Sequence, residues 1–183
     1  LQGGKAVLKD ANFEDGTIEV DMAAPRQRAF MGACFRVFDD MEEDFYLRPH
    51  KSGLADASQY MPTFGVSGTW QLFSGQGFTA AVEIPLEHWI HVTIVVEALQ
   101  ARAYLDHAKN PVLVVPQLKL GYARGGVGVW ATPGGAHFSN FYYRPADRKP
   151  KHRIPGFVPP PGVIARWELS QMFDAASRES ERY

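Results

Sequence analysis

Apolar and polar residues alternate with a period of two along most of the first 145 residues, which is typical of half-buried β-strands. In residues 17–22, for example, Ile18, Val20 and Met22 fall on one face and polar residues fall on the other. The pattern predicts strands at residues 17–22, 32–38, 44–48, 59–64, 69–73, 89–97, 101–105, 111–115, 126–130 and 136–143.

The spacing of these strands predicts the fold class. Turn-forming residues recur about every 8–12 positions and no long helical pattern lies between them, which favours an all-β sandwich or barrel. Residues 89–97 carry the clearest strand pattern, and residues 101–105 are expected to return as their hairpin partner. The composition agrees with many turns and strands, because the chain has 17 glycines, 13 prolines and 13% aromatic residues.

The composition changes after Tyr143, which predicts a boundary. Residues 144–153 are basic and broken by prolines, and residues 157–162 read as a stiff, extended segment. Residues 163–169 resemble one more strand, and Ser170 is placed to cap a short helix that begins at Gln171. We therefore expect a domain over residues 1–145, followed over residues 146–183 by a linker or strap and a short strand or helix.

Charge and cysteine content exclude several classes of protein. The 19 Lys and Arg residues against 20 Asp and Glu residues give a net charge of −1, so no basic field points to nucleic acid. No apolar run approaches the ~20 residues that a membrane span needs. Cys34 is the only cysteine, which rules out an internal disulfide and a cysteine zinc cluster. We favour a periplasmic or secreted location, although the cysteine content leaves the compartment open.

Several segments together resemble a known family. They are residues 13–20 (FEDGTIEV), 32–37, 45–53 (FYLRPHKSG), 89–92 with the hairpin to 104–106, 126–129 and 136–141. Their order resembles the concanavalin A-like, or laminin G-like, jelly roll, and within it the bacterial family-16 glycoside hydrolase-like or 3-keto-disaccharide hydrolase domains. The resemblance implies a two-sheet jelly roll whose concave sheet face binds sugars. Residues 164–173 resemble a segment that leads to a further domain in longer relatives.

The candidate sugar site lies mainly between residues 46 and 70. Sugars need flat aromatic surfaces for their C–H faces and planar donors and acceptors for their hydroxyls. Tyr46 and Arg48 share a strand face, and His50 continues that parity. The full candidate set is Arg36, Tyr46, Arg48, His50, Gln59, Tyr60, Trp70 and His137, with Asp56 in the intervening loop. The alternative is that the aromatic residues fill the core and that Arg48 pairs with an acidic neighbour.

Arg36 enters this set through strand alternation. If Ala33, Phe35 and Val37 face the core, Arg36 points to the concave or solvent face together with Cys34. Cys34 is expected to be an inert small side chain there.

Hydrolytic chemistry has little support in the sequence. Retaining glucanases of this fold carry a strand of the form Glu-x-Asp-x-(x)-Glu, and here Glu19 and Asp21 lack the last glutamate. A hydrolase needs two carboxylates that converge, and Glu83 or Glu87 could pair with Asp21 only if the fold brought them together. We therefore expect a non-catalytic module that binds an oligo- or polysaccharide, with a glycoside hydrolase or a protein-interaction sandwich as alternatives.

The acidic turn at residues 39–44 is a candidate metal site. Asp39, Asp40 and Glu42 offer the carboxylate oxygens that Ca²⁺ prefers, although the spacing of an EF-hand loop is absent. A solvated turn between two strands is the alternative. We expect no required cofactor and Ca²⁺ as the candidate ion.

Overall fold

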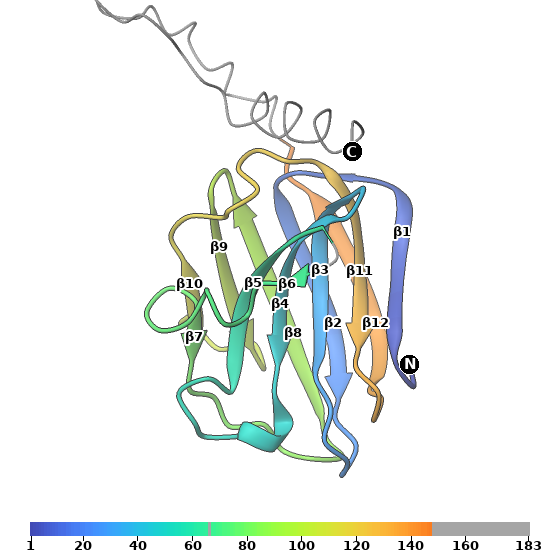
Figure 1. Cartoon of the computed structure of the whole chain (residues 1–183), viewed down its shortest axis with the longest axis vertical. Helices are drawn as coiled ribbons and strands as arrows, with labels where there is room; N and C mark the ends of the chain where they lie inside the picture. The colour runs from blue at the N-terminus through green and yellow to red at the C-terminus, as the bar shows by residue number, and fades with distance from the viewer. Residues whose placement is uncertain (66, 148–183) are drawn as a thin grey trace, which may run out of the picture. The chain divides into compact units, whose positions relative to one another are not determined.

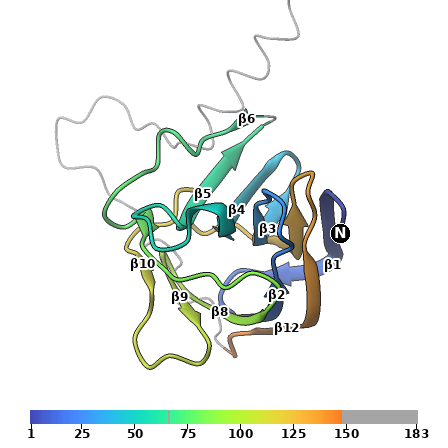
Figure 2. The same cartoon turned by 90° about the horizontal axis from the view of Figure 1, so that it is seen from below.

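Two antiparallel β-sheets pack face to face in the computed structural model, which describes residues 1–65 and 67–147 (Figures 1 and 2). The seven-stranded sheet has the order β1-β11-β3-β4-β5-β6, with β7 paired to β5, and the five-stranded sheet has the order β10-β9-β8-β2-β12. The strands are β1 Gly4–Phe13, β2 Gly16–Ala23, β3 Met31–Phe38, β4 Met41–Leu47, β5 Ser58–Phe64, β6 Ser67–Gly68, β7 Thr79–Ala80, β8 Trp89–Glu97, β9 Gln100–Leu105, β10 Leu113–Val115, β11 Gly125–Ala131 and β12 His137–Pro145.

The predicted all-β, two-sheet fold is confirmed. The core lies between the sheets, where Ile18, Val20 and Met22 of β2 meet Phe45 and Leu47 of β4. All five side chains are buried, as the period-two pattern requires. Because alternate residues face opposite ways, the neighbours of Phe45 and Leu47 on β4 project from the outer face of the seven-stranded sheet, away from the core.

The predicted strands and those of the structure differ in several places, and the short strands β6 and β7 were not predicted. The strand β1 was not predicted, because it is an edge strand whose register against β11 shifts between Leu8 and Phe13, which breaks the alternation. Residues 69–73 were predicted as a strand and form turns instead, closed by a bond from the Leu72 N–H to the Thr69 carbonyl. The predicted terminal strand and helix, and all of the strap beyond residue 147, lie outside the described residues.

One 3-10 helix, Pro49–Lys51, follows β4 directly. The Arg48 N–H donates to the Ala57 carbonyl at 2.7 Å, which folds residues 48–57 back on themselves before β5 begins. No helix among the described residues is long and apolar enough to cross a membrane.

A β-bulge in β3 alters the face on which Arg36 lies. On β11, Gly126 pairs with Val37 and Gly128 pairs with Cys34, so two β3 residues lie opposite the single residue between them. Arg36 also has a positive φ of 52°. A bulge of this kind rotates the extra residue out of the alternation, so the prediction that Arg36 points to the concave or solvent face was wrong.

Candidate functional site

A pocket of about 480 Å³ lies on the outer face of the seven-stranded sheet, over β4, β5 and β11. Its position follows from strand alternation, since Tyr46 is the outward neighbour of the core residues Phe45 and Leu47 on β4. The lining residues come from four separate stretches of the chain and are Arg28, Phe30, Tyr46, Arg48, His50, Lys51, Asp56, Met61, Trp70, Trp130 and Thr132.

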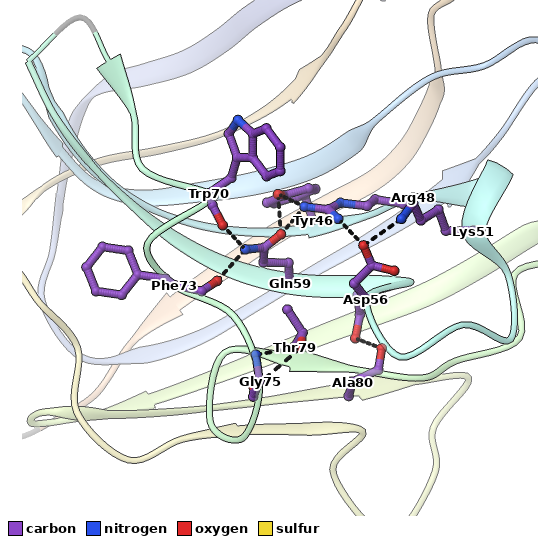
Figure 3. A network of polar contacts seen from close by, with 11 residues as sticks. Tyr46, Arg48, Lys51, Asp56, Gln59, Trp70, Phe73, Gly75, Thr79 and Ala80 are labelled. Carbon is purple, nitrogen blue, oxygen red and sulfur yellow. Dashed lines mark hydrogen bonds and ion pairs between the residues drawn. The ribbon is translucent and has the colours of Figure 1, made fainter.

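The floor of the pocket is a buried polar network (Figure 3). The Tyr46 hydroxyl donates to Gln59 Oε1 at 2.6 Å, and Arg48 Nη2 donates to the Tyr46 oxygen at 2.7 Å and also to Gln59 Oε1. Tyr46 and Gln59 can meet because they are direct partners in the β4–β5 register. The predicted common face of Tyr46 and Arg48 is thus confirmed, and Gln59 lies beneath both of them.

Gln59 also holds the loop that carries Trp70. Its amide nitrogen donates to the Trp70 carbonyl at 2.8 Å and to the Phe73 carbonyl. Gln59 is 1% exposed, so it orients the site from below and does not line the pocket. One buried amide therefore couples the Arg48 side chain to the position of the Trp70 loop.

Arg48 has a carboxylate partner, as one reading of the sequence proposed. Its Nη1 donates to Asp56 Oδ2 at 2.6 Å, and Lys51 Nζ donates to the same oxygen at 2.9 Å. The hydrogen bond from Lys51 and the charges of Arg48 and Lys51 outweigh the effect of burial and hold the pKa of Asp56 below its usual range. Asp56 therefore stays ionised and fixes both cations at the pocket wall.

Aromatic rings surround the Arg48 guanidinium. Its central carbon lies 5.2 Å from the ring centre of Tyr46, 5.7 Å from that of Trp70 and 5.8 Å from that of Phe30. These distances lie within the range of cation–π attraction. Trp70 is 49% exposed, so part of its indole remains open to solvent above the network.

A glycine permits the close packing of the pocket wall. Tyr46 and Trp130 have ring centres 5.3 Å apart, and Gly32 of β3 lies opposite both residues in the sheet. A Cβ atom at Gly32 would lie 2.6 Å from the Tyr46 Cβ and 2.9 Å from the Trp130 Nε1. Any larger residue at this position would push the two rings apart.

His50 forms the rim next to Phe30. The two ring centres are 5.0 Å apart in an edge-on arrangement. Burial and the nearby charges of Arg28, Arg48 and Lys51 lower the pKa of His50 below its ordinary value. The neutral imidazole is therefore the favoured form near pH 7, and it can donate or accept a hydrogen bond.

Three residues of the predicted set lie away from this pocket. Arg36 is fully buried, and its guanidinium donates to the carbonyls of Glu14, Ala98 and Gly121 and to Asp15. It thereby joins the turns at one end of the sandwich.

Tyr60 and His137 are the other two. Tyr60 points into the core, because it pairs with Phe45 in the register, and its hydroxyl contacts Glu43. His137 is exposed on β12 of the five-stranded sheet. Neither residue lines the pocket with Arg48, since strand pairing places one inside the sandwich and the other in the second sheet.

Several lining residues were not anticipated from the sequence. Arg28, Phe30, Trp130 and Thr132 flank the pocket because β11 lies between β1 and β3. No local pattern signals that insertion, since it depends on pairings between segments about 100 residues apart. The β11 strand itself was predicted, but its neighbours were not.

The acidic residues of the proposed metal turn separate in the structure. Asp39 and Asp40 are exposed in the turn between β3 and β4, whereas Glu42 is buried and forms an ion pair with Lys5. Among residues 1–65 and 67–147, the potential metal ligands that converge are instead Cys34, Glu42 and Asp44. Burial raises the pKa of Cys34 and of Asp44, which favours their neutral forms over metal-binding anions.

The carboxylates weighed for hydrolysis are engaged elsewhere. Asp21 accepts from Asn140 at 2.6 Å and contacts His91 Nδ1 at 2.7 Å, on the outer face of the five-stranded sheet. Glu83 accepts from Ser52, and Glu87 accepts from Arg26. Each carboxylate therefore has its own partners, and none of the three lines the pocket.

The same fold recurs in solved structures. The carbohydrate-binding module CBM66 from Bacillus subtilis has a TM-score of 0.60 and 15% identity, over 77% of this chain and 82% of that one. Congerin II with lactose and MES has a TM-score of 0.56 and 10% identity, over 77% of this chain and 100% of that one. Sheep galectin-11 with glycerol has a TM-score of 0.52 and 7% identity, over 77% of this chain and 98% of that one. No protein-family model and no curated protein sequence matches the chain. At these identities the likeness establishes a β-sandwich of the kind found in lectins and carbohydrate-binding modules.

Proposed function

We propose that this chain is a lectin-like carbohydrate-binding module and that the pocket under Trp70 is its sugar site. The observation that carries the proposal is a half-exposed indole directly above a buried network of oriented polar groups. An indole face takes the C–H side of a sugar ring, while Arg48, His50 and Asp56 offer donors and acceptors to its hydroxyls. The floor is pre-organised, so little conformational entropy is lost on binding.

The structural neighbours agree with this choice. They include a carbohydrate-binding module and a lactose-liganded congerin, on the same sandwich. A module of this kind would recognise an oligo- or polysaccharide without cleaving it and act as an accessory to polysaccharide processing. The resemblance to family-16 glycoside hydrolase-like and 3-keto-disaccharide hydrolase domains fits the same setting. We propose a periplasmic or secreted location for such a module.

The experiment is a glycan-array screen of the full 183-residue chain, repeated with added Ca²⁺ and with a chelator. The Ca²⁺ arm tests the proposed role of the acidic turn, with Asp39 and Asp40 as its exposed ligands. Specific binding to one class of glycan supports the proposal. Binding to no glycan under either condition contradicts it.

A pair of tryptophan variants places the site. Trp70→Ala removes the indole above the pocket, and Trp89→Ala removes an indole of similar exposure from the five-stranded sheet. We expect Trp70→Ala to weaken binding by about tenfold or more, and Trp89→Ala to leave it unchanged. Equal loss in the two variants, with both folded, would assign the sugar to another surface.

A further inference from the structure

The charges that line the pocket do not cancel. Three cationic side chains, Arg28, Arg48 and Lys51, face a single carboxylate, that of Asp56. Both Arg48 and Lys51 donate to the same oxygen of Asp56. In the described part of the chain no carboxylate pairs with Arg28, which lies 5.9 Å from the centre of the Phe30 ring. The pocket therefore carries two more positive charges than negative ones.

One donor of the buried arginine lacks a partner. Arg48 is 5% exposed, and its Nη1 and Nη2 groups donate to Asp56, Tyr46 and Gln59. Its Nε–H has no acceptor among the described residues. A buried donor without an acceptor is unfavourable, so the polar network of the floor leaves Arg48 incompletely satisfied.

We propose that the saccharide bound in this pocket is acidic, with a carboxylate or sulfate group that meets Arg28, Arg48 and Lys51 while its ring lies against Trp70. The inference rests on the proposed function, and it adds the chemical class of the ligand. An anion there restores the charge balance and accepts charge-assisted hydrogen bonds from the cationic side chains of the pocket. Charge-assisted bonds of this kind are stronger than those between neutral groups.

The pKa of His50 reflects the same excess of positive charge in the pocket. After burial, the causes that lower its pKa are the charges of Arg28, Arg48 and Lys51, and only a bond to the Ala29 backbone acts in the other direction. The same positive field that disfavours the imidazolium attracts an anionic ligand.

The test compares charged probes with neutral counterparts that keep the same sugar backbone. Oligogalacturonate is compared with its methyl ester, and a sulfated galactan oligosaccharide is compared with its desulfated form, by calorimetry on the full chain. We expect the charged member of at least one pair to bind about tenfold more tightly than its neutral partner. The pair that shows the difference identifies carboxylate or sulfate as the group recognised.

Variants connect the preference to the pocket. Arg28→Gln removes an exposed cation that has no ion pair within the described residues, so the fold should tolerate it, and the preference should fall about fivefold. Arg144→Gln removes an exposed cation from β12 of the other sheet and should leave the preference unchanged. Trp70→Ala should weaken both members of a pair.

The outcomes separate this inference from the proposed function. Equal binding of charged and neutral probes, lost in Trp70→Ala, would overturn the acidic preference and leave the sugar site standing. Binding of charged probes that is insensitive to Trp70→Ala and to Arg28→Gln would show surface attraction only, and it would overturn the inference. Binding of no probe, together with a blank array, would overturn both.

Discussion

The Gln59 amide donates to the carbonyl of Trp70 at 2.8 Å, while its oxygen accepts from the hydroxyl of Tyr46 at 2.6 Å. A single buried side chain thus connects the floor of the pocket to the loop that covers it (Figure 3). Because Gln59 donates twice and accepts twice, each of its polar atoms is satisfied by the fold. The position of the exposed indole therefore depends on a residue that does not line the pocket.

Replacing Gln59 should affect stability and binding together. Gln59→Leu leaves buried polar groups without partners, so we expect a loss of about 2–4 kcal/mol in the free energy of unfolding, measured by denaturant titration. Sugar binding should weaken because the Trp70 loop loses its anchor. Gln117→Leu, at an exposed position, is the matched control and should change neither quantity. An unfolding free energy of Gln59→Leu equal to that of the wild type would show that the polar network contributes nothing to stability.

Gly32→Ala should distort the pocket from below. The new Cβ would lie 2.7 Å from the Phe45 carbonyl oxygen as well as 2.6 Å from the Tyr46 Cβ, and neither atom can move alone. We expect a destabilisation of about 1–3 kcal/mol and a changed tryptophan fluorescence, since Trp130 packs on Tyr46. Unchanged fluorescence with unchanged stability would mean that the sheet adjusts without strain.

Arg36 should matter for folding and not for binding. Arg36→Met leaves the Asp15 carboxylate and three loop carbonyls without their shared donor, which should cost about 3–5 kcal/mol of unfolding free energy. Arg124→Met breaks a more exposed pair with Glu14 and should cost under about 1 kcal/mol. If the two variants lost the same unfolding free energy, the buried hydrogen bonds of Arg36 would stabilise the fold no more than the exposed ion pair of Arg124.

Asp44 should give the protein a measurable pH dependence. Burial, and next the charge of Glu42, raise the pKa of Asp44 well above its ordinary value. The folded state then holds a proton that the unfolded state has lost, so this contribution to stability is complete below the unfolded pKa and is lost as the pH rises through the raised one.

The measurement compares the wild type with Asp44→Asn, which keeps the shape of the neutral acid. The stability of the variant relative to the wild type should increase from about pH 4 to about pH 8. Denaturant unfolding at several pH values gives this difference directly. A difference that stays constant across the range would show that Asp44 is ionised in the folded protein at little cost.

Local alternation was enough to predict most of the fold. The pattern in β2 placed its core face correctly, because the direction of a side chain on a regular strand depends only on its parity. The same rule placed Tyr46 and Arg48 on one face, and the resemblance to jelly-roll domains, together with the aromatic and cationic residues of that stretch, suggested a sugar site there. These inferences need no knowledge of which strands are neighbours.

The contacts between strands were decided by the tertiary structure, because the alternation within one strand carries no information about its neighbours. The bulge in β3 reversed the face of Arg36, since an extra residue opposite one partner exists only when the strands pair. The placement of β11 beside β3 brought Trp130 to Tyr46, and strand register put Gln59 under Arg48. The sequence by itself determined which residues are apolar, aromatic or charged and which way regular strands present them. The pairing of distant segments decided which of those side chains meet, because the contacts of a sheet form between strands and not within them.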